Sequence, residues 1–377
     1  MAYDKVVDSA LLDSKLTQVA DAIRTKGNTS ADLQFPSGFI SAIQAIQTGT
    51  ELQIIVTVTS GATVTATKGS LSVSGTSVNG TCTLVVPEEG EWTVSATLGG
   101  ETSTSNIVNV TSSYDTTLAF LSTILNDNSW ETIHGISDAG TGANYWSVGD
   151  RKAVTLNGTV GALTLSNFTT YAFIIGFNHN ASLEGANRIH FQLAKTALSG
   201  GTDVALCDKY YINTSGGFRM NTSGSSSGGW ASSNMRTAIC GTSLSSYSGT
   251  IIAVIPAALR VVLKSVTKYT NNTGYSSAAS AVTETTDYFF LLSEYEVFGS
   301  TTYANSNEAS KQAQYSYYSA GNSKVKYNHG ATSTAVNWWL RSPFADSSDG
   351  FVFVYTDGTD TNTSSSYSLG FAPGFCV

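Results

Sequence analysis

The amino-acid sequence predicts a mostly β protein with some α-helix, an α+β chain in three parts. Apolar residues recur at helical spacing over residues 1–50, whereas from residue 51 they alternate with polar residues at the period of a strand. Glycine, asparagine and serine separate the alternating runs, as they do in sheets built from short strands. We therefore expect short N-terminal helices, then a small β-sandwich, then a larger β-rich domain.

The composition limits the classes of function. Charged residues make up 12% of the 377 residues, and the formal net charge is −8, whereas an average globular protein has about 25% charged residues. Hydrophobic residues make up 41%, which excludes disorder caused by low hydrophobicity. Nucleic-acid backbones are bound by clustered Lys and Arg. We therefore expect a weakly charged protein that acts outside the cell or on a particle, with no nucleic-acid partner.

Targeting signals are not evident in the sequence. Asp4 and Asp8 lie where a signal peptide has a basic region followed by an apolar one, so we expect a chain without its own export signal. The longest apolar stretch, residues 251–263, contains Pro256 and Arg260. It is too short to span a bilayer, and no membrane insertion is expected.

The four cysteines lie far apart in the sequence and form no CxxC pair. They are Cys82, Cys207, Cys240 and Cys376. Buried free thiols are the favoured interpretation. A disulfide between Cys207 and Cys240 is the alternative.

Residues 1–50 predict two short helices, each with one apolar stripe. The stripe of the first consists of Leu12, Leu16, Val19, Ala20 and Ile23. The second helix opens near Pro36 and ends before Gly49, and its stripe consists of Phe39, Ile40, Ile43 and Ile46. Short helices are marginal in water by themselves. We expect the stripes to contact each other, a partner subunit or a docking surface, so this segment is predicted to serve attachment or oligomerisation.

Residues 51–112 predict a β-sandwich of short strands. In the run EWTVSATLGG, the side chains of Trp92, Val94 and Ala96 are expected to point inward. In this pattern the segment resembles the immunoglobulin-like modules that serve as spacers in bacterial surface proteins and phage tail proteins. The resemblance implies a spacer.

Residues 113–377 predict one large domain with many strands. Two helices are expected within it, one that opens at Pro256 and one over residues 308–318. The run GFVFVYTDG reads as a strand in which Phe353 and Tyr355 share a face. We expect that face to be exposed, and a strand buried on both faces is the alternative.

Motifs for catalysis are weak throughout the chain. The four histidines match no zinc-ligand spacing. Residues 224–228 match GxSxG around Ser226, but they lie in a Ser/Gly tract rather than between a strand and a helix. Glu294 and Glu296 lie two residues apart on a strand-like run and are expected to share a face. A carboxylate pair that cleaves sugars is one interpretation, and a solvated strand face is the favoured one.

Several acidic residues near the C-terminus invite a calcium interpretation. They are Asp346, Asp349, Asp357 and Asp360. Their spacing does not form the twelve-residue loop of an EF-hand. We therefore expect a surface acidic cluster, no metal site, no cofactor and no enzymatic activity.

Two motifs near the C-terminus carry a specific resemblance. Residues 337–343 read NWWLRSP and residues 370–377 read GFAPGFCV, with a segment rich in Ser, Asp and aromatic residues between them. The chain here resembles the C-terminal domain of phage and prophage tail proteins of Gram-positive bacteria. That domain is associated with the C-type-lectin-like fold, and some members are variable proteins of diversity-generating retroelements. The likeness covers residues 145–377, and three upstream motifs agree with it: residues 229–236, 266–269 and 303–305.

The resemblance implies a hypervariable receptor-binding face. Retroelement mutagenesis acts on adenines of AAY codons and cannot produce Lys, Glu, Gln, Met or Trp, and positions 344–377 contain none of these. Ordinary drift of a Ser-rich loop is the alternative. The expected contact residues are Phe344, Ala345, Asp346, Ser348, Asp349, Phe353, Tyr355, Asp360, Asn362 and Tyr367. The expected structural frame is Trp338, Trp339, Leu340, Phe371, Pro373 and Phe375.

The resemblance also implies partners and a location. It implies a homotrimer on the phage tail of the virion, made in the cytoplasm of the bacterial host. Its partners would be a host-surface receptor, either protein or glycan, and other tail proteins that contact residues 1–50. Two rival functions stay open. One is a structural tail component whose lectin-like domain contacts virion proteins, and the other is a glycan-cleaving tail enzyme that uses Glu294 and Glu296.

Overall fold

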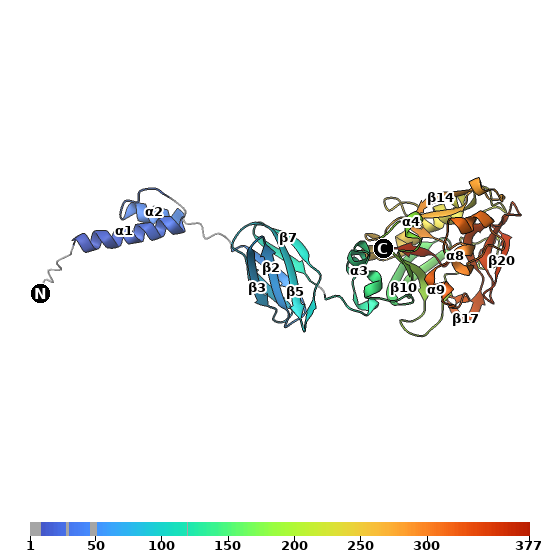
Figure 1. Cartoon of the computed structure of the whole chain (residues 1–377), viewed down its shortest axis with the longest axis horizontal. Helices are drawn as coiled ribbons and strands as arrows, with labels where there is room; N and C mark the ends of the chain where they lie inside the picture. The colour runs from blue at the N-terminus through green and yellow to red at the C-terminus, as the bar shows by residue number, and fades with distance from the viewer. Residues whose placement is uncertain (1–8, 28–29, 46–50, 119) are drawn as a thin grey trace. The chain divides into compact units, whose positions relative to one another are not determined.

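The computed structural model describes residues 9–27, 30–45, 51–118 and 120–377. About 36% of the chain is strand and 22% is helix, so the predicted combination of much strand with some helix is confirmed. The chain divides into two compact units, residues 1–120 and residues 121–377 (Figure 1). Among the described residues, no helix is long and apolar enough to cross a membrane. Asp4, Asp8, Ile46 and Gly49, on which some predictions rest, lie outside the described residues.

Two helices form near the N-terminus, as predicted. They are α1 (Ser9–Lys26) and α2 (Ser37–Ala45). Their contact buries Ala20, Ile23 and Phe39, which is a very small core. The large apolar side chains that stay exposed on this segment are Leu11, Leu12, Val19, Phe35, Ile40 and Ile43. The helical hairpin therefore keeps most of its apolar stripe in contact with water.

Residues 51–118 form a layered β structure with two sheets. One sheet has the order β4–β1–β8, and in the other β3, β2 and β5 follow one another, with β6 and β7 both paired to β5. The strands are β1 (Gln53–Thr57), β2 (Thr63–Lys68), β3 (Leu71–Thr76), β4 (Thr81–Val85), β5 (Gly90–Leu98), β6 (Glu101–Thr102), β7 (Asn106–Val110) and β8 (Ser113–Thr117). Trp92, Val94 and Ala96 of β5 are buried, as the alternation predicts.

The predicted boundary after residue 112 is too early. Strand β8 pairs in parallel with β1, with Ser113 opposite Gln53 and Thr117 opposite Thr57. Residues 113–117 therefore belong to the sandwich. A parallel pairing between segments so far apart in the sequence leaves no local sequence pattern that would reveal it. The turn after β7, in contrast, is visible in the sequence and indicates a boundary there.

The C-terminal unit is built on one five-stranded sheet. Its order is β15–β21–β11–β10–β9, with β9 (Arg151–Val160), β10 (Leu163–Phe177), β11 (Ile189–Lys195), β15 (Phe289–Phe290) and β21 (Gly374–Cys376). Strand β21 is thus inserted between two strands that precede it by many residues. Phe375 lies opposite Phe191 on one side and opposite Phe289 on the other.

Three smaller sheets surround this one. Their orders are β18–β19–β20, β12–β16–β17 and β13–β14. The strands are β12 (Val204–Ala205), β13 (Val266–Asn271), β14 (Val282–Asp287), β16 (Lys326–Asn328), β17 (Ala331–Val336), β18 (Trp338–Pro343), β19 (Gly350–Val354) and β20 (Asp360–Ser364). In Figure 1, β17 and β20 lie in the orange to red part of this unit.

The helices of the C-terminal unit are short. The α-helices are α3 (Trp130–Asp138), α4 (Ala181–Glu184), α5 (Gly229–Ser232), α6 (Ile251–Val254), α7 (Ala257–Arg260), α8 (Glu294–Phe298) and α9 (Ser316–Ser319). A π-helix covers Met235–Cys240, and 3₁₀ turns cover Leu125–Asp127, Gly142–Asn144, Ala279–Ala281 and Ser306–Ser310.

The helix predictions for this unit are met only in part. The helix after Pro256 is present as the single turn α7. The continuous helix over residues 308–318 is wrong, because a 3₁₀ turn and α9 stand there instead. Between them, the backbone N–H of Tyr315 donates to the carbonyl of Glu296 (3.0 Å) and its side chain is buried. This tertiary contact interrupts the helix.

All four cysteines are free and buried. The favoured interpretation is therefore confirmed, and Cys207 and Cys240 are not joined. Burial raises the pKa of the Cys207 thiol to about 12, which keeps it in the unreactive protonated form.

Candidate functional site

The six residues expected to form the structural frame are all buried in the C-terminal unit. The two indoles of β18 also have hydrogen-bond partners, since Trp338 donates to the carbonyl of Lys324 and Trp339 to that of Phe218, both at 2.9 Å. Phe375 stacks on Phe191 with 5.3 Å between the ring centroids. The strands that flank residues 344–369 are thus anchored by apolar packing and by satisfied polar groups.

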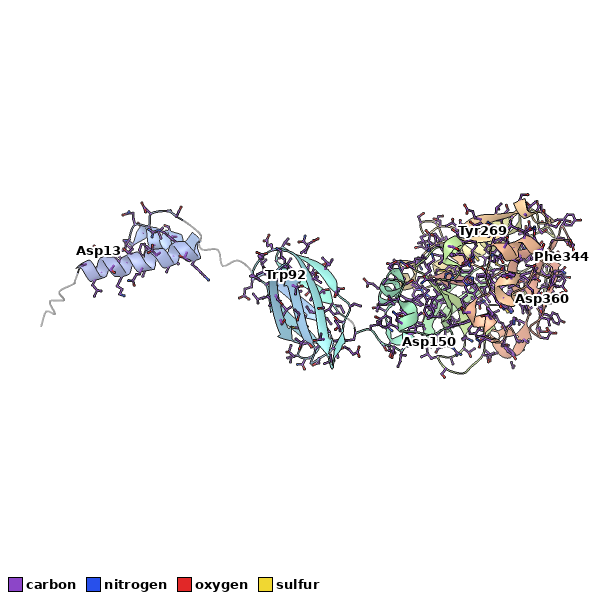
Figure 2. All side chains as sticks on the ribbon, in the orientation of Figure 1. Asp13, Trp92, Asp150, Tyr269, Phe344 and Asp360 are labelled. Carbon is purple, nitrogen blue, oxygen red and sulfur yellow. The ribbon has the colours of Figure 1, made fainter. Side chains whose placement is uncertain are left out.

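The ten residues expected to make contacts differ in exposure. The exposed ones are Asp346, Ser348, Asp349, Tyr355 and Tyr367, and the half-buried ones are Phe344, Ala345, Asp360 and Asn362. Figure 2 labels Phe344 and Asp360 in the C-terminal unit.

The prediction that Phe353 is exposed is wrong, because its side chain is only 5% exposed. Strand β19 lies between β18 and β20, and all five of its residues are buried. The Phe353 ring packs edge-on against Trp339 with 6.1 Å between the centroids. The alternative of a strand buried on both faces therefore holds for β19. Tyr355, one residue beyond its end, is 46% exposed.

The loop between β18 and β19 is fixed at both ends. The N–H of Phe344 donates to the carbonyl of Gly350 (3.0 Å), and that of Ala345 donates to the carbonyl of Tyr303 (2.9 Å). The rings of Phe344 and Tyr303 meet edge to face at 5.8 Å. Within the loop, the hydroxyl of Ser347 donates to Asp349. The exposed side chains thus extend from a backbone with a defined conformation.

A second loop, residues 213–228, borders this segment. The sequence did not indicate that these two segments lie next to each other. The N–H of Ser226 donates to the carbonyl of Ser348 (2.7 Å), and that of Asn221 donates to the carbonyl of Ser365 (3.0 Å). The hydroxyl of Ser365 accepts from the N–H of Ser225 (2.9 Å). Ser226, the centre of the GxSxG match, is buried. Its hydroxyl donates to the carbonyl of Ser347 (3.3 Å), so it supports the loop between β18 and β19.

Glu294 and Glu296 do not lie on a solvated strand face, and that prediction is wrong. Both belong to helix α8, and both are completely buried. Ser293 caps the helix, with its hydroxyl accepting from the N–H of Glu296 and the Glu296 carboxylate accepting from the N–H of Ser293. The sequence did carry this signal, because Ser followed three residues later by Glu is a capping box.

Glu294 connects α8 to the edge strand β20. Its carboxylate accepts the backbone N–H groups of Thr302 (2.8 Å) and Ala304 (2.7 Å). Burial, and next a hydrogen bond with the carboxyl group of Asp360, raise the pKa of Glu294 to about 8. No N–H or hydroxyl of the described residues donates to Oδ2 of Asp360, which is buried. The Glu294 carboxyl is therefore mostly protonated at neutral pH.

Glu296 belongs to a buried ionic cluster. It accepts from Lys268 (2.9 Å) and from Arg341 (2.8 Å), and Lys268 also donates to Glu184 (2.6 Å) and to the hydroxyl of Tyr315 (2.8 Å). Burial alone would raise the pKa of Glu296, but Arg341 and Lys268 hold it below its ordinary value. These opposite charges are enclosed together, which makes the cluster a structural feature whose members depend on one another.

Three residues of this cluster have metal-ligand atoms close together. One ligand atom from each of His179, Glu184 and Glu296 lies within 4.8 Å of the others. The ammonium of Lys268, however, donates to both of these carboxylates. Burial, and next the charge of Lys268, lower the pKa of His179 to about 3. The position of a cation between the carboxylates is therefore taken by the protein's own ammonium group.

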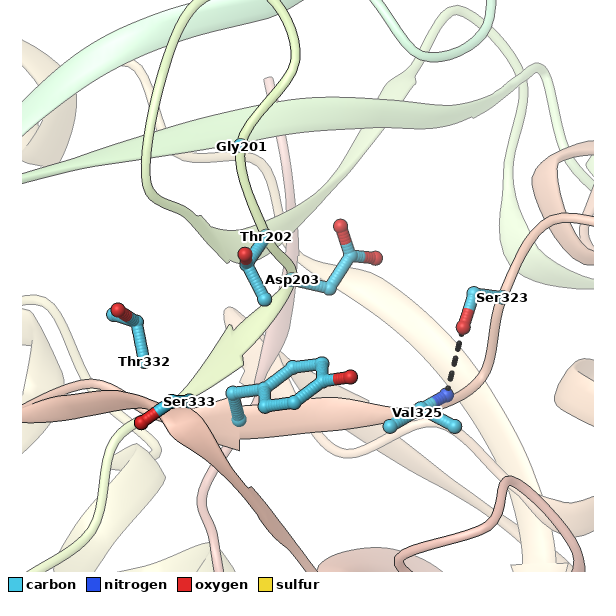
Figure 3. A pocket seen from close by; sticks show the side chains of 8 residues that line it. Gly201, Thr202, Asp203, Ser323, Val325, Thr332 and Ser333 are labelled. Carbon is cyan, nitrogen blue, oxygen red and sulfur yellow. Dashed lines mark hydrogen bonds between the residues drawn. The ribbon is translucent and has the colours of Figure 1, made fainter.

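A polar groove of about 560 Å³ lies in the C-terminal unit (Figure 3). It is lined by Gly201, Thr202, Asp203, Ser323, Val325, Tyr327, Thr332 and Ser333. The Asp203 carboxylate accepts from Lys195 and from the hydroxyl of Tyr317 (3.3 Å). A Cβ atom placed on Gly358, in the turn between β19 and β20, would lie 3.3 Å from Val325. The groove offers hydroxyl groups and one fixed carboxylate to a hydrogen-bonding ligand.

Comparison with known families finds one match in the C-terminal unit. Residues 202–377 match a family described as a domain of unknown function, DUF6273. The matched region contains β18, β19 and β20, the loop 213–228 and the ionic residues Lys268, Glu296 and Arg341. No curated protein matches the chain.

Proposed function

We propose that the chain is a phage tail receptor-binding protein that recognises the bacterial host surface through a hypervariable face. In this proposal the helices α1 and α2 attach it to other tail proteins and form a homotrimer. Residues 51–118 form an immunoglobulin-like spacer, and the C-terminal unit is a C-type-lectin-like binding domain. The protein resides in the virion and is not an enzyme.

One observation carries the proposal. Between two buried strands, β18 and β21, the chain exposes Asp346, Ser348, Asp349, Tyr355 and Tyr367. Tyrosine supplies a large contact area with few rotatable bonds, and Ser and Asp supply adaptable hydrogen bonds, as in antibody paratopes. We expect the surrounding frame to keep its packing when these side chains change, because the frame residues are buried and these side chains are exposed. Three linked copies would strengthen a weak single contact by raising the effective concentration.

The carboxylates that a glycan-cleaving enzyme would need are not available for that reaction. Glu296 is engaged by Arg341 and Lys268, and Glu294 by three backbone N–H groups and Asp360. Both are completely buried. This arrangement supports a binding protein over the rival enzyme. Release of soluble cell-wall sugar by the wild-type protein, lost on replacing both glutamates, would contradict this assignment.

The proposal is tested by flow cytometry with the fluorescently labelled full-length protein on a panel of Gram-positive strains, including the one that carries the gene. We expect saturable binding to at least one strain, and we expect Tyr355→Ser with Tyr367→Ser to weaken it at least tenfold. Tyr145→Ser is the matched control, since Tyr145 and Tyr367 are both 40% exposed. Absence of binding to every strain, or equal binding by the double variant, would favour the structural tail component instead.

A further inference from the structure

Ile212 has a backbone conformation that its side chain disfavours. Among the described residues, six non-glycine residues have a positive φ, and five of them are asparagines: Asn79, Asn167, Asn178, Asn180 and Asn187. The sixth is Ile212, with φ of +56°. Asparagine enters this left-handed region readily, whereas a β-branched residue there is a genuine outlier. The surrounding structure therefore has to hold Ile212 in place.

A hydrogen bond from Ile212 to Ser368, which is itself bonded to Asp208, provides that restraint. The N–H of Ile212 donates to the carbonyl of Ser368, and the N–H of Ser368 donates to the carbonyl of Asn213, both at 2.8 Å. The Asp208 carboxylate is buried, and it accepts from the hydroxyl of Ser368 (2.9 Å) and the N–H groups of Tyr210 and Phe218 (both 3.0 Å). The turn that carries Ile212 is thus held by hydrogen bonds within the protein.

The side chain of Ile212 gains little stabilisation from burial within the protein. It is 60% exposed, and its neighbours Tyr210 and Tyr367 are exposed as well. Tyr367 precedes Ser368, to which Ile212 is hydrogen-bonded, so Ile212 lies beside one of the expected contact residues. Strained residues that persist in a structure cluster at binding sites, and exposed apolar side chains that lie together, as Ile212 does with Tyr210 and Tyr367, mark protein contacts. An aliphatic side chain offers no hydrogen bond to a sugar hydroxyl, whereas an apolar pocket of a protein would bury it.

We propose that Ile212 is a fixed apolar anchor of the receptor-binding face, and that it is buried in an apolar pocket of a protein on the host surface. This inference rests on the proposed function and names its partner class. Ile212 lies outside the segment 344–377. The anchor would therefore be present in every variant of the diversified segment and would supply a constant share of the affinity.

The test is the substitution Ile212→Asn in the full-length protein. Because asparagine tolerates the left-handed conformation, we expect the Tm of the C-terminal unit to stay the same or rise by a few degrees. We expect binding to the cells recognised by the wild-type protein to weaken at least tenfold. Val261→Asn is the matched control, since Val261 is 78% exposed and has ordinary helical backbone angles. It should bind as the wild type does.

Cells treated with proteinase K, and cells treated with periodate to oxidise glycans, identify the class of receptor. We expect treatment with proteinase K to abolish binding of the wild-type protein, and we expect treatment with periodate to leave this binding unchanged. Binding that survives proteinase K would overturn the assignment of a protein partner. Unchanged binding by Ile212→Asn, with loss of binding by the Tyr355 and Tyr367 double variant, would overturn the anchor but not the proposed function. Unchanged binding by both would contradict both.

Discussion

At the scale of single residues, Glu294 of α8 is buried and is hydrogen-bonded to Asp360 of the edge strand β20. The folded protein holds the proton of Glu294 up to a pKa of about 8, whereas the ordinary value for Glu294 is 4.5. Between these values the folded state binds more protons than the unfolded chain. The free energy of unfolding therefore falls as the pH rises through this window, by at most about 1.4 kcal/mol per pH unit.

Replacing Asp360 with Asn should flatten this pH dependence. The amide N–H of Asn donates to the Glu294 carboxylate without a titrating proton, so the decrease in Tm between pH 5 and pH 8 should shrink, although burial of Glu294 remains. At pH 8.5 the variant should be at least as stable as the wild type. Thermal unfolding followed by circular dichroism measures this. Asp357→Asn, an exposed change in the same hairpin, should keep the wild-type slope, and an equal slope in Asp360→Asn would refute the contribution of Asp360 to the raised pKa of Glu294.

The neighbouring residues Phe353 and Tyr355 should respond very differently to substitution. Phe353→Ser removes a buried ring from the central strand β19 and leaves a cavity with a hydroxyl in it, at a cost of about 3–5 kcal/mol by analogy with Phe→Ala. We expect its Tm to fall by about 10 °C. Tyr355→Ser should change the Tm by no more than a few degrees. Differential scanning calorimetry of both variants checks this, and equal Tm values would mean that β19 is not central.

The local sequence predicts which residues form the buried structural frame, but it does not predict which of the expected contact residues are exposed. Adjacent Trp338 and Trp339 carry so much apolar area that burial follows from composition alone. Alternation tells which residues of β19 share a face, but it cannot tell how many faces are covered. That depends on β20 pairing along the outer edge, a contact made only in the folded chain.

At the scale of elements, the hairpin of α1 and α2 has more apolar surface than its own contact can bury. Leu12 and Val19 lie on one stripe of α1, and both are about half exposed. Together with Leu16 and Ile23 they have the alternating spacing of four and three residues that coiled coils use. This pattern favours association with other copies of the chain, in agreement with the homotrimer that we propose.

The double substitution Leu12→Glu and Val19→Glu should convert the homotrimer to a monomer, because charges at these positions cannot be buried between helices. Light scattering after size-exclusion chromatography measures the mass. Ser14→Glu with Gln18→Glu adds the same charge on the opposite side of α1 and should leave the trimer intact. A wild-type protein that runs as a monomer at micromolar concentration would contradict the role of this helix.

Element types were predictable where one pattern dominated. The sandwich strands alternate cleanly over five or more residues, and α1 has a repeated apolar spacing. The sequence predicts a strand where helix α8 lies, because the apolar run before Ser293 has the composition of a strand. The capping box at Ser293 and Glu296 is the local feature that decides the conformation. The prediction of a helix over residues 308–318 is wrong for a different reason, because Tyr315 is buried by a long-range contact.

At the scale of the whole molecule, part of the small set of charged side chains lies in the interior and not on the surface. Eleven charged side chains of the described residues are buried: Lys152, Glu184, Lys195, Asp208, Lys268, Asp287, Glu294, Glu296, Glu308, Lys326 and Arg341. Many of them pair inside the C-terminal unit. The surface is thus dominated by neutral polar groups, which gives little electrostatic steering toward or away from a charged partner.

The composite nature of the candidate site was beyond the reach of the sequence. Residues 213–228 and 344–369 lie side by side through hydrogen bonds between segments more than a hundred residues apart. A Ser/Gly tract predicts a loop, but it does not indicate which segment of the chain the loop contacts. The positive φ of Ile212 is likewise imposed by Ser368 and Asp208, so it could not be inferred from the residues beside it.

The insertion of β21 between β11 and β15 has a consequence for how new receptor-binding variants would be screened. A stop codon or a frameshift anywhere in residues 344–369 would remove β21 and with it the strand that joins β15 to the rest of the central sheet. Such a product has no completed core and would be degraded before assembly. Under the function that we propose, the fold would thereby act as a reading-frame check, because only intact versions of a mutated gene would yield a folded protein.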